Sequence, residues 1–188
     1  MRLTLQQRQT DLRRLQLAMG VLVAVDEQEK FAGAAMAFCN ELASRWQCDM
    51  VGLGFLKGRY VQLKALSHTE KFTRKMKIVQ DIEAAMEECL DQDVEVVHPS
   101  GEEDTCVSRA AAELSARHGP LAVVSLPLRR EQDPVAVVTA HRPADRPFGA
   151  SEIEAMRLTT DLCAPRLDNR FRQDRWFGAK ATGAVRSA

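Results

Sequence analysis

The stretch MVGLGFLKGRYVQLKALS, residues 50–67, carries the clearest structural signal in the chain. Its first part, Met50–Leu56, is short and apolar and contains two glycines. Lys57-Gly58 has the composition of a tight turn, and apolar residues then alternate with polar ones from Tyr60 to Leu66. The pattern predicts two antiparallel strands joined by a hairpin.

A second hairpin is predicted further along, in LAVVSLPLRREQDPVAVVTAHR. Leu121–Leu128 and Pro134–His141 are its strands, and Arg129–Asp133 connects them. Pro127 cannot donate a hydrogen bond to a neighbouring strand, so it indicates an edge position or a bulge. Between the two hairpins, Val94–Val97 is predicted as one further short strand.

Helical periodicity surrounds these strands. Capping-box patterns, Asp26 with Glu29 and Ser151 with Glu154, predict where the second and the last helix begin. Pro165 is expected to kink or interrupt the last helix. The predicted helices span residues 3–25, 26–47, 76–91, 105–117 and 151–176. Hairpins and short strands in this order favour an antiparallel α+β fold over a series of βαβ units.

Composition limits the classes of partner. The chain has 188 residues, enough for one domain with a core of its own. Lys plus Arg and Asp plus Glu number 26 each, so the net charge is zero, and only 5% of residues are aromatic. Domains that bind nucleic acid usually carry a basic excess or aromatic stacking residues, so we expect no nucleic-acid partner.

The cysteines and histidines are scattered. No CxxC occurs, and the pattern predicts neither a disulfide framework nor a metal site. We therefore expect reduced thiols and a cytoplasmic location. The longest apolar run, Leu17–Val25, is too short for a bilayer span, which needs about 20 residues.

Taken together, residues 26–176 resemble a GAF domain. The resemblance lies in the helix Phe31–Trp46 leading into residues 50–67, in the VEVVHP strand, in the second hairpin and in the FGASEIEAM opening of the last helix. It implies an α+β fold with a central antiparallel sheet, helices on one face, and flanking N- and C-terminal helices. On the other face it implies a ligand pocket beneath loops and a helix.

The resemblance also implies a function in sensing. GAF domains bind small molecules or only dimerise, so we expect a non-catalytic sensory domain whose ligand and cofactor the sequence leaves unknown. The residue set of cyclic-nucleotide GAF domains is absent as an ordered series, and no Cys-His dipeptide indicates bilin attachment. Two alternatives stay open: a thiol-based reductase of the free methionine sulfoxide type, and a structural dimerisation domain whose pocket is filled by its own side chains.

Four residues are candidates for ligand contact, and no catalytic or metal-binding residue is assigned. Cys106 lies at a predicted helix start, where it is either a reactive thiol or a first-turn residue without a task. Arg109 either holds an anion in the pocket or forms a surface ion pair with Glu113, four residues on. His141 shares its strand face with Val135, Val137 and Thr139, so it is either a ligand contact or a core histidine. His68 follows the second strand in a polar loop and is either a pocket contact or solvated.

The two ends of the chain are predicted to lie outside the GAF-like unit. Residues 1–25 form an amphipathic dimerisation helix whose apolar seam is Leu5, Leu12, Leu15, Met19 and Leu22. The seam pairs either with a second copy or with the C-terminal helix of its own chain. Residues 177–188 are predicted to be a disordered tail. The arginine-rich helix before that tail is either a solvated helix end or a connector to an output or membrane-adaptor domain in a longer chain.

Overall fold

The computed structural model describes residues 2–101 and 106–185, with side chains over residues 7–101 and 106–176. The helices are α1 (Arg2–Asp26), α2 (Phe31–Arg45), α3 (Lys77–Gln92), α4 (Arg109–His118) and α5 (Ala150–Val185). The strands are β1 (Met50–Lys57), β2 (Tyr60–Leu66), β3 (Val96–His98), β4 (Leu121–Arg130) and β5 (Asp133–Pro143). This order of elements is the predicted one.

All five strands join one sheet in the order β2-β1-β5-β4-β3, and every neighbouring pair is antiparallel. The α+β class and both hairpins are confirmed. The first hairpin turns at Gly58, whose φ of 67° lies in the left-handed region that glycine adopts without strain. Pro127 lies where β4 has a free outer edge, because β3 pairs only with Val123–Ser125. The edge position that the proline indicates is therefore confirmed.

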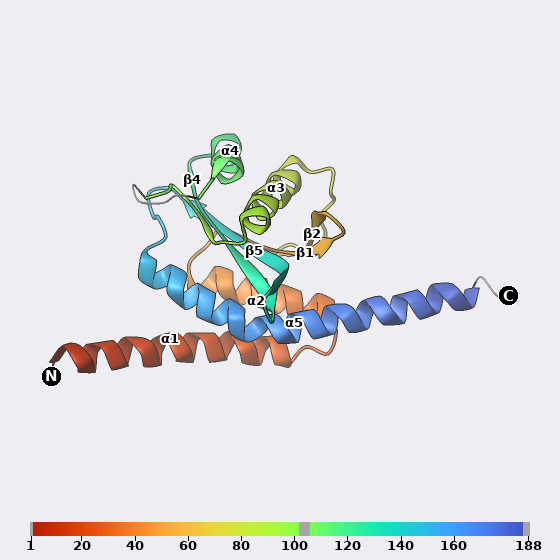
Figure 1. Cartoon of the computed structure of the whole chain (residues 1–188), viewed down its shortest axis with the longest axis horizontal. Helices are drawn as coiled ribbons and strands as arrows, with labels where there is room; N and C mark the ends of the chain where they lie inside the picture. The colour runs from red at the N-terminus through yellow and green to blue at the C-terminus, as the bar shows by residue number, and fades with distance from the viewer. Residues whose placement is uncertain (1, 102–105, 186–188) are drawn as a thin grey trace.

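Helices cover both faces of the sheet (Figure 1). On one face lie α2 and α5, with α1 packed against both of them. The other face carries α3 and α4. The resemblance implies loops and a helix on that second face, and the structure has two helices there.

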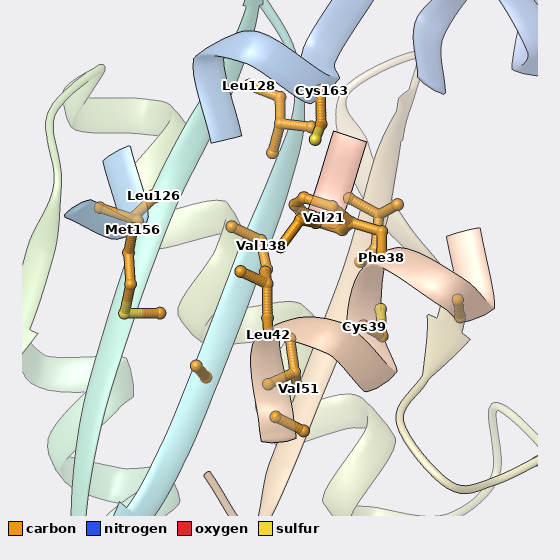
Figure 2. Packing of buried hydrophobic residues seen from close by; sticks show 14 of the residues in the cluster. Val21, Phe38, Cys39, Leu42, Val51, Leu126, Leu128, Val138, Met156 and Cys163 are labelled. Carbon is orange, nitrogen blue, oxygen red and sulfur yellow. The ribbon is translucent and has the colours of Figure 1, made fainter. Parts of the chain in front are cut away.

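The larger core lies between the sheet and the pair α2 and α5, and Figure 2 shows part of it. Phe38 and Leu42 of α2 point toward Val51 and Val138 of the sheet, and Met156 of α5 lies against Leu126. The predicted inner face of the second helix is confirmed, since all five of its residues are buried: Phe31, Ala35, Phe38, Leu42 and Trp46.

Both capping-box predictions are wrong. Helix α1 continues to Asp26, and α2 begins only at Phe31, after Lys30, whose side chain makes no capping hydrogen bond. At the start of α5, Glu152 takes the expected role of Glu154 and accepts a hydrogen bond from the Gly149 N–H at 3.0 Å. Local spacing misled here because Asp26 and Glu154 pair with arginines of other helices instead of capping.

The last helix is longer and more continuous than predicted. It passes through Pro165 without interruption, and the buried residues Ala164 and Leu167 hold it against the body on either side of the proline. Helix α5 continues to Val185, through most of the segment predicted as a disordered tail, and residues 186–188 lie outside the described part of the chain. Among the described residues, no helix is long and apolar enough to cross a membrane.

Arg142, near the end of β5, joins the sheet to two helices. Its guanidinium donates to the backbone carbonyl of Trp46 after α2 at 2.8 Å and to the carboxylate of Glu152 in α5 at 2.7 Å. The ring of Phe148 lies under it, 4.2 Å from the guanidinium carbon. Burial of Glu152 opposes its ionisation, but the hydrogen bonds from Arg142 and the Gly149 N–H lower its pKa.

Candidate functional site

The sheet face beneath α3 and α4 carries three buried polar side chains on its central strands: Ser125, Thr139 and His141. Ser125 and Thr139 are opposite each other in the register, and their hydroxyls are 2.8 Å apart, so each is satisfied by the other. His141 is only 6% exposed, and neither of its ring nitrogens has a hydrogen-bond partner among the described residues. Burial lowers its pKa to about 4, because charging an imidazole away from water is costly.

Apolar side chains fill the space around this row. They come from both helices and from the sheet: Leu63, Ile82, Met86, Leu114, Val123 and Val137. The closeness of α3 depends on glycine, because a Cβ added at Gly54 would lie 2.6 Å from the sulfur of Met86 and 2.5 Å from Cγ1 of Val61. The interior on this side is therefore packed by the chain's own side chains.

One carboxylate ties the end of α4 to α3. Asp81 is buried and accepts hydrogen bonds from Arg117 at 2.6 Å and Lys77 at 2.9 Å, with Nε2 of His118 also 2.9 Å away. Burial of Asp81 opposes its ionisation, but these three partners lower its pKa. The nearby charge of Asp49 raises the pKa of His141 and that of His118 lowers it, and both effects are smaller than that of burial.

The other end of α4 is held by α3 as well. The Glu88 carboxylate accepts hydrogen bonds from the N–H groups of Ala110 at 2.8 Å and Ala111 at 3.2 Å. The Gln92 side-chain amide pairs with both the N–H and the carbonyl of Val107. Since Glu88 occupies the N–H groups at the start of α4, the helix begins at Arg109 rather than at residue 105.

The four candidate residues lie on different segments. Cys106 lies in the loop before α4 and is partly exposed. Arg109 is exposed and forms the expected ion pair with Glu113, 3.3 Å apart. His68 is exposed in a turn after β2, with a φ of 56°, and its N–H donates to the side chain of Asn40 at 2.8 Å. Of the four, His141 alone lies on the buried face of the sheet under α3 and α4.

No sequence pattern identified Ser125 as part of the polar row that contains Thr139 and His141. Strand parity already placed Thr139 on the same face as His141, so that signal was present. Ser125 joins this row only through the β4–β5 register. Such contacts between distant segments have no short-range sequence signature.

Four of the five cysteines are buried: Cys39, Cys48, Cys89 and Cys163. Burial raises the pKa of Cys39, and it raises the pKa of the other three to about 12. Nucleophilic sulfur chemistry requires the thiolate, which these environments disfavour. Among the described residues, no three His, Cys, Asp or Glu side chains gather in a way that could hold a metal ion.

Helix α1 packs on its own chain in parallel with α5. Arg14 pairs with Glu154 at 2.8 Å, and further along Asp26 lies 3.6 Å from the guanidinium groups of both Arg166 and Arg170. The inward face of α1 consists of the fully buried Ala18, Val21 and Val25.

The predicted seam of α1 faces mostly the other way. Leu12 is 60% exposed, Leu15 and Met19 are 45% exposed, and Val23 continues the row at 52%. Leu22 is partly buried against the core, and the side chain of Leu5 lies outside the described residues. Spacings of three and four residues place the four exposed side chains on one helix face, opposite the buried one. We call them the outer row of α1.

Comparison with known proteins gives one family. The sequence matches the GAF domain family over residues 33–167. A search of curated proteins finds no match to the chain.

Solved structures share the fold at low sequence identity. The GAF domain of an Acinetobacter phosphoenolpyruvate-protein phosphotransferase is 8% identical with a TM-score of 0.64, covering 87% of this chain and 98% of that one. The corresponding domain from Coxiella burnetii is 12% identical with a TM-score of 0.62, covering 89% and 98%. A free methionine-R-sulfoxide reductase from Neisseria meningitidis is 11% identical with a TM-score of 0.57, covering 85% and 91%. At these identities the similarity shows the fold alone.

Proposed function

The chain belongs to the GAF domain family. We propose that it is a regulatory domain that catalyses no reaction and forms a homodimer through helix α1. The observation that carries the proposal is the outer row of α1, which is apolar, exposed and on the face that its own chain leaves uncovered. The thiol-based alternative has less support, because four of the five thiols are buried with raised pKa values. The free thiols also support a reducing compartment, and we propose the cytoplasm.

A second copy is the occupant that fits the outer row best. A two-fold contact brings the same patch of each copy together, so Leu15 and Met19 meet their own counterparts. A helix of 25 residues is about 37 Å long, which gives room for an extended contact. Each large side chain that becomes fully buried contributes roughly 1.5–3 kcal/mol. Helix α5 packs along the inner side of α1, so each α5 is in direct contact with the helix that forms the dimer. We propose that α5 transmits the signal to an output domain.

Sedimentation velocity at several protein concentrations tests the homodimer. We expect the native protein to sediment as a dimer and the variant Met19→Glu to sediment as a monomer, because the two-fold contact places the new carboxylates against each other. The matched control is Val107→Glu, which puts the same charge on an exposed apolar residue outside α1 and leaves the dimer intact. A native monomer at every concentration, or a dimer of Met19→Glu, would contradict the proposal.

Small-molecule sensing is a second candidate function, and His141 is the observation that favours it. A buried polar group without a hydrogen bond costs about 1–3 kcal/mol, and a ligand that supplies the missing partner removes this cost. Because side chains fill the space around His141, such a ligand needs α3 or α4 to move outward. It would therefore act by shifting the population toward an opened state.

A thermal-shift screen against small polar metabolites tests this second function. We expect at least one compound to raise the melting temperature of the native protein and to leave that of His141→Phe unchanged. The substitution keeps a planar aromatic ring, somewhat larger than the imidazole, and removes both nitrogens. A compound that stabilises both proteins equally binds elsewhere and would count against a site at His141.

A further inference from the structure

A cleft of about 370 Å³ lies on the other face of the sheet, where α5 passes the tips of the two hairpins. Phe55 and Leu56 of β1 and Val135 of β5 line it, together with Phe171, Arg172 and Arg175 of α5 and the residues Arg130, Asp133, Pro134 and Asp168. We call it the α5 cleft. Its walls come from three segments far apart in the sequence, and it is separated from His141 by the sheet itself.

The floor of the α5 cleft is aromatic. The ring of Phe171 lies 4.1 Å from the ring of Phe55 and 5.0 Å from that of Phe31, measured between centroids. Two cations approach the same ring: the Lys64 ammonium at 5.5 Å and the Arg175 guanidinium at 5.8 Å from its centroid. The cleft therefore combines an apolar base with positive charge at its margin.

The positive charge is only partly neutralised. Arg130 pairs with Asp168 at 3.3 Å, and these two charges offset each other. Among the described residues, Arg172, Arg175 and Lys64 form no ion pair, and Asp133 is the one other carboxylate lining the cleft. The pKa of Lys64 is lowered by its burial and by the nearby charges of Lys57 and Arg175, which is what a region of net positive potential produces.

We propose that the α5 cleft binds a small organic anion with an apolar body. Arg172 and Arg175 hold the carboxylate, sulfonate or phosphate group, and the body lies on Phe171 and Val135. Guanidinium groups suit this role because their planar N–H groups match the oxygens of such anions.

The shape and charge of the cleft favour a small ligand over a long polyanion. Its volume lies in the range of ordinary ligand sites, about 300–1,000 Å³. The carboxylate of Asp133 stands among the lining residues and repels a second negative charge, which an extended polyanion would bring there. A single anionic group next to an aromatic or aliphatic body satisfies both arginines and covers the rings.

Binding at this position acts directly on α5. Among the described side chains of α5, Phe171 is the last that packs against the core, and residues 172–176 are exposed. A ligand that contacts Arg172 and Arg175 on one side and the hairpin tips on the other joins the exposed part of α5 to the sheet. A ligand in the cleft thus contacts the helix that we propose to transmit the signal. This holds for a monomer and for a dimer.

Titration calorimetry on the full chain tests the site with three probes: naphthalene-2-carboxylate, the uncharged naphthalene-2-methanol, and acetate. We expect the naphthalene carboxylate to bind at least tenfold more tightly than either of the others, because it alone has both the ring and the charge. In Arg172→Gln/Arg175→Gln we expect at least a tenfold loss of affinity for it. The matched control Lys71→Gln/Lys75→Gln removes two positive charges from an exposed loop and keeps the native affinity.

Amide chemical shifts locate the probe. We expect the largest changes at Leu56 and Val135 and unchanged shifts at His141. Equal binding of acetate, an unaffected arginine double variant, or shift changes centred on His141 would each overturn the proposal. Met19→Glu is expected to bind the probe normally, so a failure here is distinguishable from a failure of the homodimer.

Discussion

His141 carries a buried polar group that the described part of the chain leaves without a hydrogen bond. Its imidazole is buried, neutral and without a hydrogen-bond partner among the described residues, and burial lowers its pKa to about 4. In the unfolded chain an imidazole titrates near 6.5. Between these two values the unfolded state binds more protons than the folded state, so stability falls as the pH is lowered through this window.

The expected loss on going from pH 7.5 to pH 5 is about 2 kcal/mol from His141. Urea unfolding at the two pH values measures it. The variant His141→Phe is expected to remove most of the difference. A smaller dependence of the same sign is expected to remain from His98, whose pKa burial also lowers. Equal pH dependence in the native protein and the variant would show that His141 is hydrated or partnered in solution.

For single residues, the sequence predicted the face on which a side chain lies but not the partners that it contacts. Strand alternation correctly placed His141 on one face with Val137 and Thr139. Nothing in the sequence identified Arg142 as a central contact, because its partners, the Trp46 carbonyl and Glu152, belong to other elements. Local patterns predict the face of a residue, and tertiary packing decides what it touches there.

At the scale of elements, the approach of α3 to β1 depends on Gly54. A methyl group there would meet Val61 and Met86 within 2.6 Å. We expect Gly54→Ala to destabilise the protein by roughly 1–3 kcal/mol, as overpacking does in well-filled cores. Thermal or urea unfolding measures the change.

Two further variants test whether the contact with α3 causes the destabilisation expected for Gly54→Ala. Met86→Ala removes one of the two obstructing side chains, so the double variant Gly54→Ala/Met86→Ala is expected to be less destabilised than the sum of the single variants. The matched control is Gly149→Ala, where the nearest atom is 3.8 Å from the added carbon and we expect little change. If the losses of unfolding free energy in the two single variants simply added up in the double variant, the strain would lie elsewhere.

The elements differ in how well the sequence predicted them. Both hairpins were found because Gly58 and the alternation of apolar residues act within a few positions. The start of α4 was wrong because Glu88 and Gln92, from another helix, determine where it begins. Helix starts that are capped by distant side chains have no local pattern to read.

At the scale of the whole molecule, α1 belongs to the core of its own chain. Ala18, Val21 and Val25 are fully buried against α2 and α5. The sequence predicted the helix and its apolar seam, but α1 packs on α2 and α5 of its own chain through the opposite face. Both faces contain apolar residues at helical spacing, so periodicity alone could not assign them.

Two truncations test this role of α1. Removing residues 1–26 exposes the apolar surfaces of α2 and α5 that these side chains cover, and we expect a loss of several kcal/mol in unfolding free energy or aggregation. Removing residues 1–9 spares the buried face, and we expect stability close to native. A stable, soluble protein lacking residues 1–26 would support the predicted boundary of an independent unit at residue 26.

Helix α5 leaves the body at Phe171 and continues to Val185, which at 1.5 Å per residue is about 21 Å of rod. A rod held at one end behaves as a lever, and it pivots at the contacting rings of Phe31, Phe55 and Phe171. With that arm, a tilt of about 5° at the rings carries the far end about 2 Å sideways. A rearrangement too small to disturb the sheet is thus magnified before it reaches whatever the helix touches.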